Sequence, residues 1–321
     1  MRKFIALAAI CSLAIAAFYI SSCKGKKSEP QANNKEDSLK KVLARGEYLT
    51  LHVVPCLDCH SKRDFSKFSG PLVPGTEGMG GEVFDQKLAG VPGTVYAKNI
   101  TPDNETGIGT WTDDEILRAM TQGINKKGDT LFPIMPYPNF NRMAKTDLLS
   151  IIAFIRTLKP INNVVPARQL FVPIGVVYPG KFLQPSVDSN MAPPASDIVK
   201  YGGYLAMVAD CGTCHSPLTP QGPDHTRMFA GGYIFDLGSN KVASANITPD
   251  STGIGGWSEE RFMSKFTTYR DSSQINRDPG NQNTIMPLSI LAGMKDEDIK
   301  AIYAYLRTVA PIRNVVEKFP K

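Results

Sequence analysis

Two pentapeptides of the pattern Cys-x-x-Cys-His, at residues 56–60 and 211–215, have the spacing that attaches c-type haem to protein. In such a site each cysteine sulfur adds to a vinyl group of the porphyrin. The histidine of each motif, His60 or His215, then becomes the proximal ligand of the iron. The sequence therefore predicts two covalently bound haems c, attached through the motif cysteines, which are Cys56, Cys59, Cys211 and Cys214.

Other uses of paired cysteines fit the sequence less well. A structural zinc site needs four ligands close together, and a thioredoxin-type redox pair belongs in a βαβ context and requires no following histidine. The two remaining cysteines, Cys11 and Cys23, lie in and just after an N-terminal apolar stretch, so none is left over for a structural disulfide. We therefore interpret both pentapeptides as haem sites.

A methionine late in each half of the chain is the candidate for the sixth iron ligand. Met135 and Met286 lie 75 and 71 residues after the motif histidines, each directly before a proline. A thioether sulfur favours Fe(II) and raises the reduction potential. A second corresponding pair, Met143 and Met294, sits close to the last predicted helices and is interpreted as packing.

The two histidines outside the motifs, His52 and His225, are interpreted as solvent-facing or core imidazoles. His52 lies only four residues before Cys56, so as a ligand it would have to cross to the opposite porphyrin face. Each haem is therefore predicted to have one histidine and one methionine ligand.

Most of the chain is an internal duplication with an offset of about 150 residues. Matching segments are 80–84 with 231–235, 99–103 with 246–250, 106–111 with 252–257, 134–136 with 285–287 and 160–165 with 311–316. Four repeated side chains are predicted to lie around the haems without binding iron: Asn99, Asn246, Trp111 and Trp257. The asparagines would belong to a loop at the haem edge. The tryptophans would either donate to propionates or wall the pocket.

Helices are predicted at corresponding places in the two copies. They cover residues 38–53 and 196–209 before the attachment motifs, begin after residues 112 and 258, and cover 146–158 and 296–308 near the ends. Thr112 and Glu115 form a capping box at one of these starts. Glycine and proline are dense elsewhere, so the remainder is predicted to be loop, and each haem would complete a core that the polypeptide alone lacks.

This pattern resembles class I c-type cytochromes, which implies an all-α fold of two tandem cytochrome c-like domains with long loops. The predicted organisation is a signal peptide (1–22), a polar tether (23–37), domain 1 (38–165), a Pro-rich interdomain strap (166–195) and domain 2 (196–321). The strap is too apolar for a free linker and is expected to pack along the domains, with a flexible connector as the alternative.

Residues 99–111 and 132–138 also resemble the cytochrome subunits of membrane-bound alcohol and gluconate dehydrogenases. The resemblance implies an electron carrier, not an enzyme, that passes single electrons from a periplasmic or membrane-bound dehydrogenase to a downstream cytochrome or oxidase. Those subunits typically have three haem motifs, so the quinone-reducing role that needs all three is not carried over.

The second copy departs from this pattern near its methionine. Thr284 stands where the first copy has Pro133, and residues 269–283 replace the segment 123–132. A more open second pocket is therefore expected, and a dihaem, peroxidase-like enzyme is the alternative function. A redox sensor is a third reading, but we see no output domain in the sequence.

The N-terminus has the pattern of a signal peptide. An apolar run at residues 4–20 follows Arg2 and Lys3, and small residues then precede Cys23. The last four residues, 20–23, resemble a bacterial lipobox, which implies cleavage before Cys23, its lipidation, and a periplasmic protein anchored to a membrane. An uncleaved anchor helix is the alternative, although the run is shorter than the roughly 20 residues of a membrane span.

The charge of the chain points to no nucleic-acid partner. The formal charge of +6 falls to +4 when the two basic residues of the signal peptide are removed. The propionates of two haems would bring it close to zero.

Overall fold

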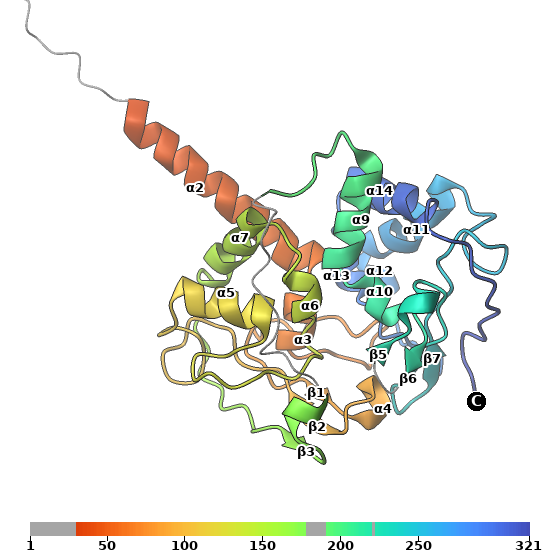
Figure 1. Cartoon of the computed structure of the whole chain (residues 1–321), viewed down its shortest axis with the longest axis horizontal. Helices are drawn as coiled ribbons and strands as arrows, with labels where there is room; N and C mark the ends of the chain where they lie inside the picture. The colour runs from red at the N-terminus through yellow and green to blue at the C-terminus, as the bar shows by residue number, and fades with distance from the viewer. Residues whose placement is uncertain (1–29, 178–190, 220–221) are drawn as a thin grey trace, which may run out of the picture. The chain divides into compact units, whose positions relative to one another are not determined.

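The structure is a computed structural model that describes residues 30–177, 191–219 and 222–321 (Figure 1). The predicted signal peptide, the lipidation site Cys23 and residues 178–190 of the predicted strap lie outside these ranges. Residues 42–321 form one unit, and the chain up to Lys41 belongs to another. Both attachment motifs therefore lie in the same unit.

The first half contains short helices separated by long loops, with a small antiparallel sheet. Its elements are α2 (Pro30–Tyr48), the π-helix η1 (Leu49–Val53), α3 (Cys56–His60), β1 (Val83–Phe84), α4 (Gln86–Ala89), β2 (Gly93–Tyr96), α5 (Asp113–Gln122), α6 (Tyr137–Phe140), α7 (Lys145–Ile155), β3 (Gln169–Leu170) and α8 (Ile174–Val177).

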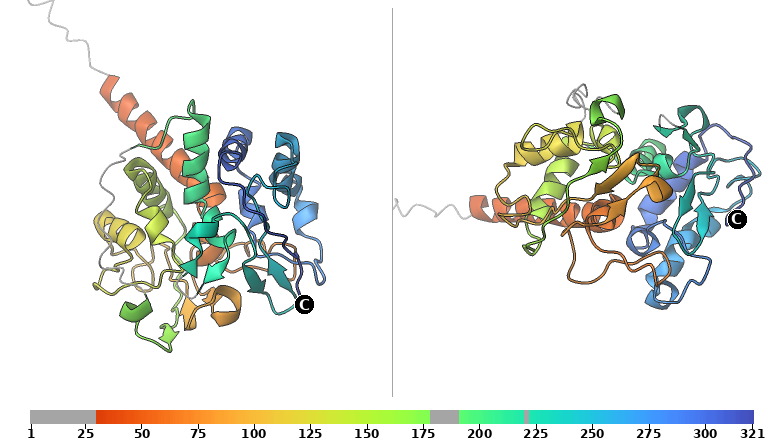
Figure 2. Two further views of the ribbon diagram at one scale, coloured as in Figure 1. Left: turned by 45° about the vertical axis from the view of Figure 1, so that its right-hand side comes forward. Right: turned by 90° about the horizontal axis from the view of Figure 1, so that it is seen from below.

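The second half repeats much of this order. Its elements are α9 (Ile198–Val208), α10 (Cys211–Cys214), β4 (Leu218–Thr219), β5 (Gly222–Pro223), η3 (His225–Arg227), β6 (Ile234–Asp236), β7 (Lys241–Ala243), α11 (Glu259–Thr267), η4 (Thr268–Arg270), α12 (Ser272–Ile275), α13 (Leu288–Leu291) and α14 (Asp296–Leu306). The strands lie towards the opposite end of the unit from α7, α9 and α14 (Figures 1 and 2).

The helices follow the sequence expectations closely, and their starts show why. The side chain of Thr112 accepts a hydrogen bond from the backbone N–H of Glu115, whose carboxylate accepts one from the Thr112 N–H, completing the predicted capping box of α5. Ser258 caps α11 in the same way by accepting from the N–H of Arg261. Local side-chain chemistry therefore fixes both helix starts.

Some elements differ from the prediction. The predicted polar tether is helical from Pro30 onward, because α2 begins there. Short hairpins occur in segments expected to be loops: β1 pairs with β2 and β6 pairs with β7, all antiparallel. Turn-forming glycines separate such short strands well but give no strand signal of their own.

The predicted strap begins as an added strand and does not stay extended. Gln169 and Leu170 form β3, which pairs with β2 in the register Gly93↔Leu170. A side chain at Gly93 would overlap the backbone of Gln169, so the close approach of the two strands requires glycine there. Residues 174–177 then turn into the helix α8.

In each half the first long helix crosses the last one at a glycine. A Cβ at Gly46 would overlap the carbonyl of Ser150 in α7, and a Cβ at Gly202 would overlap the carbonyl of Ala301 in α14. The two helix pairs therefore pack backbone against backbone at equivalent points.

The first half has one more residue than the second between this crossing and its attachment motif. Ten positions separate Gly46 from Cys56, and nine separate Gly202 from Cys211. The extra residue coincides with the π-helical turn η1, whereas α9 is an ordinary α-helix over the same stretch. A π-turn accommodates one added residue within a helix, as expected for such a bulge.

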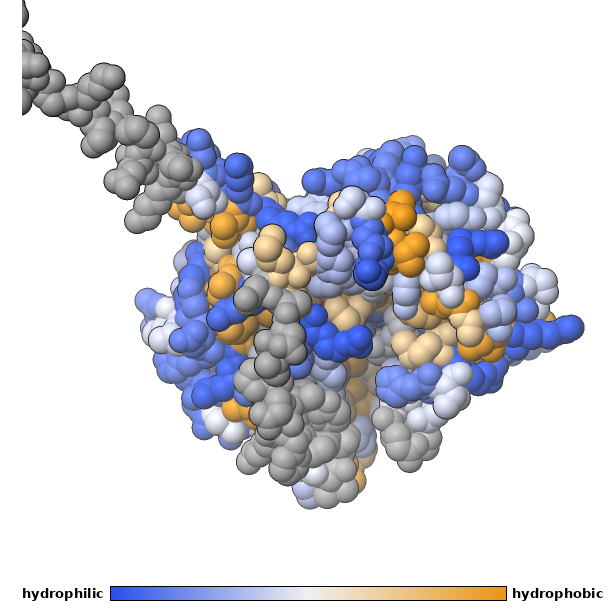
Figure 3. All heavy atoms as spheres, turned by 45° about the horizontal axis from the view of Figure 1, so that its top comes forward, coloured by the Kyte–Doolittle hydropathy of each residue, from blue (hydrophilic) through white to orange (hydrophobic). Residues whose placement is uncertain are grey.

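The two halves share one hydrophobic core and reciprocal polar contacts. The largest cluster of buried side chains includes Leu49 and Ile151 from the first half and Leu205 and Ile299 from the second. Exposed apolar side chains reach the surface drawn in Figure 3 only in small separate groups. The halves are thus packed together by much of their apolar surface.

Candidate haem sites

The four motif cysteines lie in pairs on two short helices. Cys56 and Cys59 are in α3, and Cys211 and Cys214 are in α10. Because residues three apart on a helix share a face, each pair can direct both sulfurs to the same side. This placement of both cysteine pairs is compatible with two thioether bonds to one porphyrin at each motif.

The cysteines are poorly suited to the competing zinc and redox chemistries. Burial raises the pKa of the Cys56 thiol to about 12 and that of Cys211 to about 12, and it raises the pKa of Cys59 as well. Zinc binding and disulfide exchange both use the thiolate. Across the described ranges no three His, Cys, Asp or Glu side chains are placed to hold a metal ion.

Both motif histidines are held by the same backbone contact. Nδ1 of His60 lies 2.6 Å from the carbonyl oxygen of Lys98, and Nδ1 of His215 lies 2.7 Å from that of Ala245. A carbonyl oxygen only accepts, so Nδ1 carries the proton and Nε2 keeps a free lone pair for a metal. Burial lowers the pKa of both imidazoles, although these hydrogen bonds partly oppose it, which favours the neutral form that binds iron.

The repeated asparagines anchor the loops that supply these carbonyls. Asn99 is buried and donates to the carbonyl of Ile161 (2.8 Å) and to Thr106 Oγ1 (3.0 Å). Its own carbonyl oxygen accepts from the Thr101 N–H at 2.9 Å. The residue directly before it, Lys98, supplies the carbonyl that holds the motif histidine His60. The predicted place of the asparagine beside the haem stays a prediction, but its amide fixes the loop that orients the ligand.

Asn246 makes the corresponding contacts in the second half. It donates to the carbonyl of Ile312 at 2.8 Å and to Thr252 Oγ1 at 3.1 Å, and it accepts from the Thr248 N–H at 2.9 Å. The carbonyl of the preceding residue, Ala245, again accepts a hydrogen bond from the motif histidine, His215. Sequence reasoning missed the part played by Lys98 and its counterpart, and their constant position before a repeated asparagine was the signal available.

The tryptophans are half-buried against the shared core. The backbone carbonyl of Trp111 accepts from Arg156 at 2.7 Å. The ring of Trp257 is covered by the cations of Arg261 and Lys265, at 4.5 and 5.2 Å from the ring centroid. Whether either indole faces a propionate stays a prediction.

The two candidate methionine ligands differ from the other repeated pair in their exposure. Met135 and Met286 are half-buried and pack against the core with one side free, whereas Met143 and Met294 are 1% exposed and wholly enclosed. Each candidate lies just before a short helix, α6 or α13. Its carbonyl accepts from the N–H two residues on, at 2.7 Å in the first half and 2.8 Å in the second. This exposure suits a thioether that still has an external partner.

The residues that distinguish the second methionine loop are engaged in hydrogen bonds. Thr284 Oγ1 accepts from the N–H of Met286 at 3.2 Å, and Asn283 Oδ1 accepts from the N–H of Thr284 at 2.8 Å. The first copy has Pro133 in place of Thr284. The departures from the first copy thus add bonds to the loop, and the expected opening of the second pocket stays a prediction.

The other histidines lie where packing positions them. His52, in η1, packs against Gly293, where an added Cβ would overlap the imidazole, and its Nδ1 lies 3.3 Å from the carbonyl of Ile290. His225 is in the short helix η3. The contacts of His52 fit the core role predicted for it.

Side chains of the two attachment motifs lie close enough to influence each other electrostatically. Burial, followed by the nearby carboxylate of Asp58, raises the pKa of the Cys59 thiol. The carboxylate of Asp58 acts in turn on Cys214. The motif of one half therefore lies within electrostatic reach of the motif of the other.

The residues present fit a covalently bound haem at each motif. Each site offers two sulfurs on one helix face, a neutral imidazole with Nε2 free and a half-buried thioether later in the same half. Half-buried apolar side chains complete the surroundings: Ile100, Trp111 and Leu158 in the first half, and Ile247, Trp257 and Val309 in the second.

Comparison with known proteins agrees with this chemistry. Residues 199–310 match the family model of cytochrome c. The chain is 27% identical over 88% of its length to the cytochrome c subunit of a quinone-dependent alcohol dehydrogenase from Gluconobacter oxydans, covering 57% of that protein. It is 27% identical over 84% of its length to the gluconate 2-dehydrogenase cytochrome c subunit of Pantoea cypripedii, covering 59% of it.

A further relative matches this chain over most of the length of both proteins. A diheme cytochrome c-type protein of Cereibacter sphaeroides is 29% identical over 80% of this chain, which covers 82% of that protein. The chain spans less than two thirds of the dehydrogenase subunits that it matches. Within the described ranges, no helix combines the length and the apolar character needed to cross a membrane.

The site and the comparisons together define the class. Residues 199–310 have the pattern of a cytochrome c domain, and this match implies covalently bound haem c. More particularly, the chain resembles the cytochrome c subunits of dehydrogenases.

Proposed function

We propose that this protein is a dihaem c-type cytochrome that carries single electrons and turns over no substrate at iron. The supporting observation is the twofold occurrence of one arrangement, a Cys-x-x-Cys-His helix whose histidine Nδ1 is held by a loop carbonyl, leaving Nε2 free. His60 and Met135 would bind one iron, and His215 and Met286 the other. The halves 38–165 and 196–321 would be tandem cytochrome c domains joined by the strap.

Haem c supplies a one-electron iron couple, and the chain's residues keep its ligands in place. The imidazoles are fixed by backbone hydrogen bonds, and the methionine loops by bonds to their own and neighbouring backbone. A filled and rigid coordination sphere changes little between oxidation states, which suits fast electron transfer. It also keeps small molecules from the iron.

Closeness of the two motifs supports electron passage between the haems. Besides burial, the carboxylate of Asp58 raises the pKa of the Cys214 thiol, so side chains of the two attachment motifs lie within electrostatic range of each other. One haem would receive an electron from the donor and the other would deliver it.

The similarity to dehydrogenase subunits supports a dehydrogenase as the electron donor. The relatives concerned are cytochrome c subunits of alcohol and gluconate dehydrogenases. The acceptor would be a downstream cytochrome or oxidase. The protein would act in the periplasm, held to a membrane through lipid on Cys23.

The dihaem enzyme is the competing function, and the structure adds nothing in its favour. The N–H and the carbonyl of Met286 are both hydrogen-bonded, so the loop that would have to move is held firmly.

The two functions are separated by one set of spectra on purified holoprotein. An electron carrier should contain two haems per chain, show the near-infrared methionine-to-iron band at two-haem intensity when oxidised, and bind no carbon monoxide when reduced. Prompt carbon monoxide binding at one haem would favour the enzyme, and a single haem per chain would contradict the dihaem proposal.

A further inference from the structure

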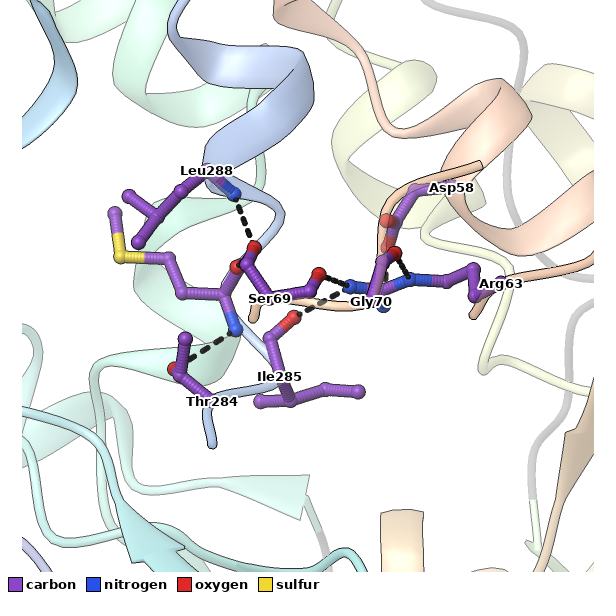
Figure 4. Close-up of polar contacts among 8 residues, drawn as sticks. Asp58, Arg63, Ser69, Gly70, Thr284, Ile285 and Leu288 are labelled. Carbon is purple, nitrogen blue, oxygen red and sulfur yellow. Dashed lines mark hydrogen bonds and ion pairs between the residues drawn. The ribbon is translucent and has the colours of Figure 1, made fainter. Parts of the chain in front are cut away.

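The loop that contains Met286 rests on a segment of the other half of the chain, residues 63–70 (Figure 4). Ser69 Oγ donates a hydrogen bond of 2.6 Å to the carbonyl of Met286 and accepts one of 2.9 Å from the N–H of Leu288. One hydroxyl therefore bridges the backbone on the C-terminal side of the methionine. Sequence separation between the partners exceeds 200 residues, so this contact depends on the docking of the two halves.

Arg63 holds the backbone of Ser69 by hydrogen bonding. Its buried guanidinium donates to the carbonyls of Ser69 (2.6 Å) and Gly70 (2.8 Å), and it forms an ion pair with Asp58 at 3.2 Å. It also reaches the carbonyl of Ile285 at 3.3 Å. Since Asp58 lies inside the first attachment motif, Arg63 joins that motif to the loop of the second methionine.

Asn283, in the loop that contains Met286, forms further hydrogen bonds to the segment 63–70. Its Oδ1 accepts from the N–H of Ser69 at 2.8 Å, and its Nδ2 donates to the carbonyls of Phe65 (2.9 Å) and Lys67 (3.2 Å). The side chain is 1% exposed, so these bonds are shielded from water. Buried and fully bonded amides rigidify the segments that they join.

Ser69 has a backbone conformation that is unfavourable for serine. Its φ is +66°, in the left-handed region that glycine adopts most easily. A non-glycine residue persists in such a conformation only where its surroundings over-determine it. The two bonds of its hydroxyl to the methionine loop account for a serine where glycine would be less strained.

We propose that Ser69, supported by Arg63 and Asn283, is a positioning residue for Met286, so that the first half sets the sixth ligand of the second haem. This inference rests on the proposed function, in which Met286 binds that iron. The first methionine loop receives a different and more distant contact, from Asn139 to Asp210, which leaves the backbone of Met135 untouched.

Imidazole, which competes with methionine for iron, reports how firmly the loop is held. Oxidised holoprotein of the Ser69→Ala and Ser69→Gly variants is titrated with imidazole while the near-infrared methionine-to-iron band is followed. Losing the two bonds should lower the apparent Kd at one haem about tenfold, and half of the band should disappear at the lower concentration. Agreement between the two variants separates the hydroxyl from the backbone strain, which glycine relieves.

Ser66→Ala is the matched control, because Ser66 lies in the same segment, is exposed and bonds only to Asp64. It should leave both imidazole affinities unchanged. Asn283→Ala loosens the same contact from the other side and should reproduce the one-haem shift even if a Ser69 variant folds poorly.

A double-mutant comparison assigns the haem. In a Met286→Ala background, Ser69→Ala should have no further effect on imidazole binding, whereas in a Met135→Ala background its effect should persist. An unchanged affinity in the Ser69 and Asn283 variants, or a shift that survives Met286→Ala, overturns the positioning role. If Met286→Ala itself leaves the band at full intensity, the ligand assignment in the proposed function has failed instead.

Discussion

The hydroxyl of Tyr204, in the second half, donates a hydrogen bond of 2.7 Å to the buried carboxylate of Asp147 in the first. The equivalent tyrosine of the first half, Tyr48, donates in turn to Asp298 in α14. Each half thus inserts a tyrosine from its first long helix into the last helix of the other. Arg45 completes the first of these contacts by an ion pair with Asp147 at 2.8 Å.

Replacing either tyrosine by phenylalanine should weaken the docking of the halves. Tyr204→Phe removes one bond from a buried carboxylate, and we expect a loss of about 1–3 kcal/mol in the free energy of unfolding. Tyr48→Phe should have a similar effect, and denaturant unfolding of both holoprotein variants provides the measurement. Tyr96→Phe, outside these contacts, serves as control. Unchanged stability in both variants would show that the contacts are not part of the docking.

Asp210 should make the stability of the protein depend on pH. Its carboxylate accepts bonds of 2.5 Å from Asn139 and from Thr213, yet burial raises its pKa to about 7. The folded state therefore holds this proton more tightly than the unfolded chain, in which the pKa is about 3.9. The stability that the protonated form provides is complete below about pH 4 and is lost as the pH rises to about 7.

The Asp210→Asn variant should lose this dependence. Asparagine keeps the acceptor oxygen and tolerates the left-handed backbone found at this position, where φ is 56°. Between about pH 4 and pH 7, the free energy of unfolding of this variant should rise relative to that of the natural protein by about 1.4 kcal/mol per pH unit. Denaturant unfolding at pH 4, 5.5, 7 and 8 provides the measurement. Asp114→Asn, at an exposed position, is the control. A difference that stays constant with pH would rule out the raised pKa.

Each methionine variant should affect its own haem. Met135→Ala and Met286→Ala each remove the thioether from one iron, so one haem should become high spin and half of the near-infrared band should be lost. The optical spectrum and the haem content check this directly. Met143→Ala, in the enclosed core, should keep the near-infrared band at full intensity. It should lower the free energy of unfolding by about 2–5 kcal/mol. A low-spin spectrum with the full band in either ligand variant would refute that assignment.

The glycines at the two helix crossings should tolerate no side chain. A methyl group at Gly46 or Gly202 overlaps backbone atoms of Ser150 or Ala301, which cannot move away as a side chain can. Gly46→Ala and Gly202→Ala should each cost at least 1–3 kcal/mol, the range of overpacked cores. Gly256→Ala meets no atom within 4 Å and should change the melting temperature little. Equal melting temperatures for all three variants would contradict the tight crossing.

The sequence predicted the helices well because local signals specify them. The capping box at Thr112 and the apolar spacing of residues 146–158 and 296–308 depend on neighbours a few positions away. The short strands carried no such signal, since their pairing is decided by glycine turns and by a distant segment such as residues 169–170.

The sequence motifs predicted which residues belong to the candidate sites, but they did not predict most of the contacts that position those residues. Residue types and spacing suggested the cysteines, the histidines and the two methionines, and their roles at iron stay predictions. The position of Lys98 and Ala245 directly before the repeated asparagines was the available signal that their carbonyls hold the histidines, because a backbone carbonyl leaves no trace in the side-chain pattern itself. The support of the second methionine loop by Ser69 was equally hidden, since it depends on how the halves dock.

The π-helical turn η1 has a consequence for how the two copies have diverged. An extra residue in an ordinary helix would rotate everything after it by about 100° and carry the first cysteine pair away from its porphyrin. Widening a single turn accommodates the extra residue within η1, so the residues after it need not rotate by that amount. The two copies can therefore differ by one residue before their motifs without a matching turn of the attachment helix.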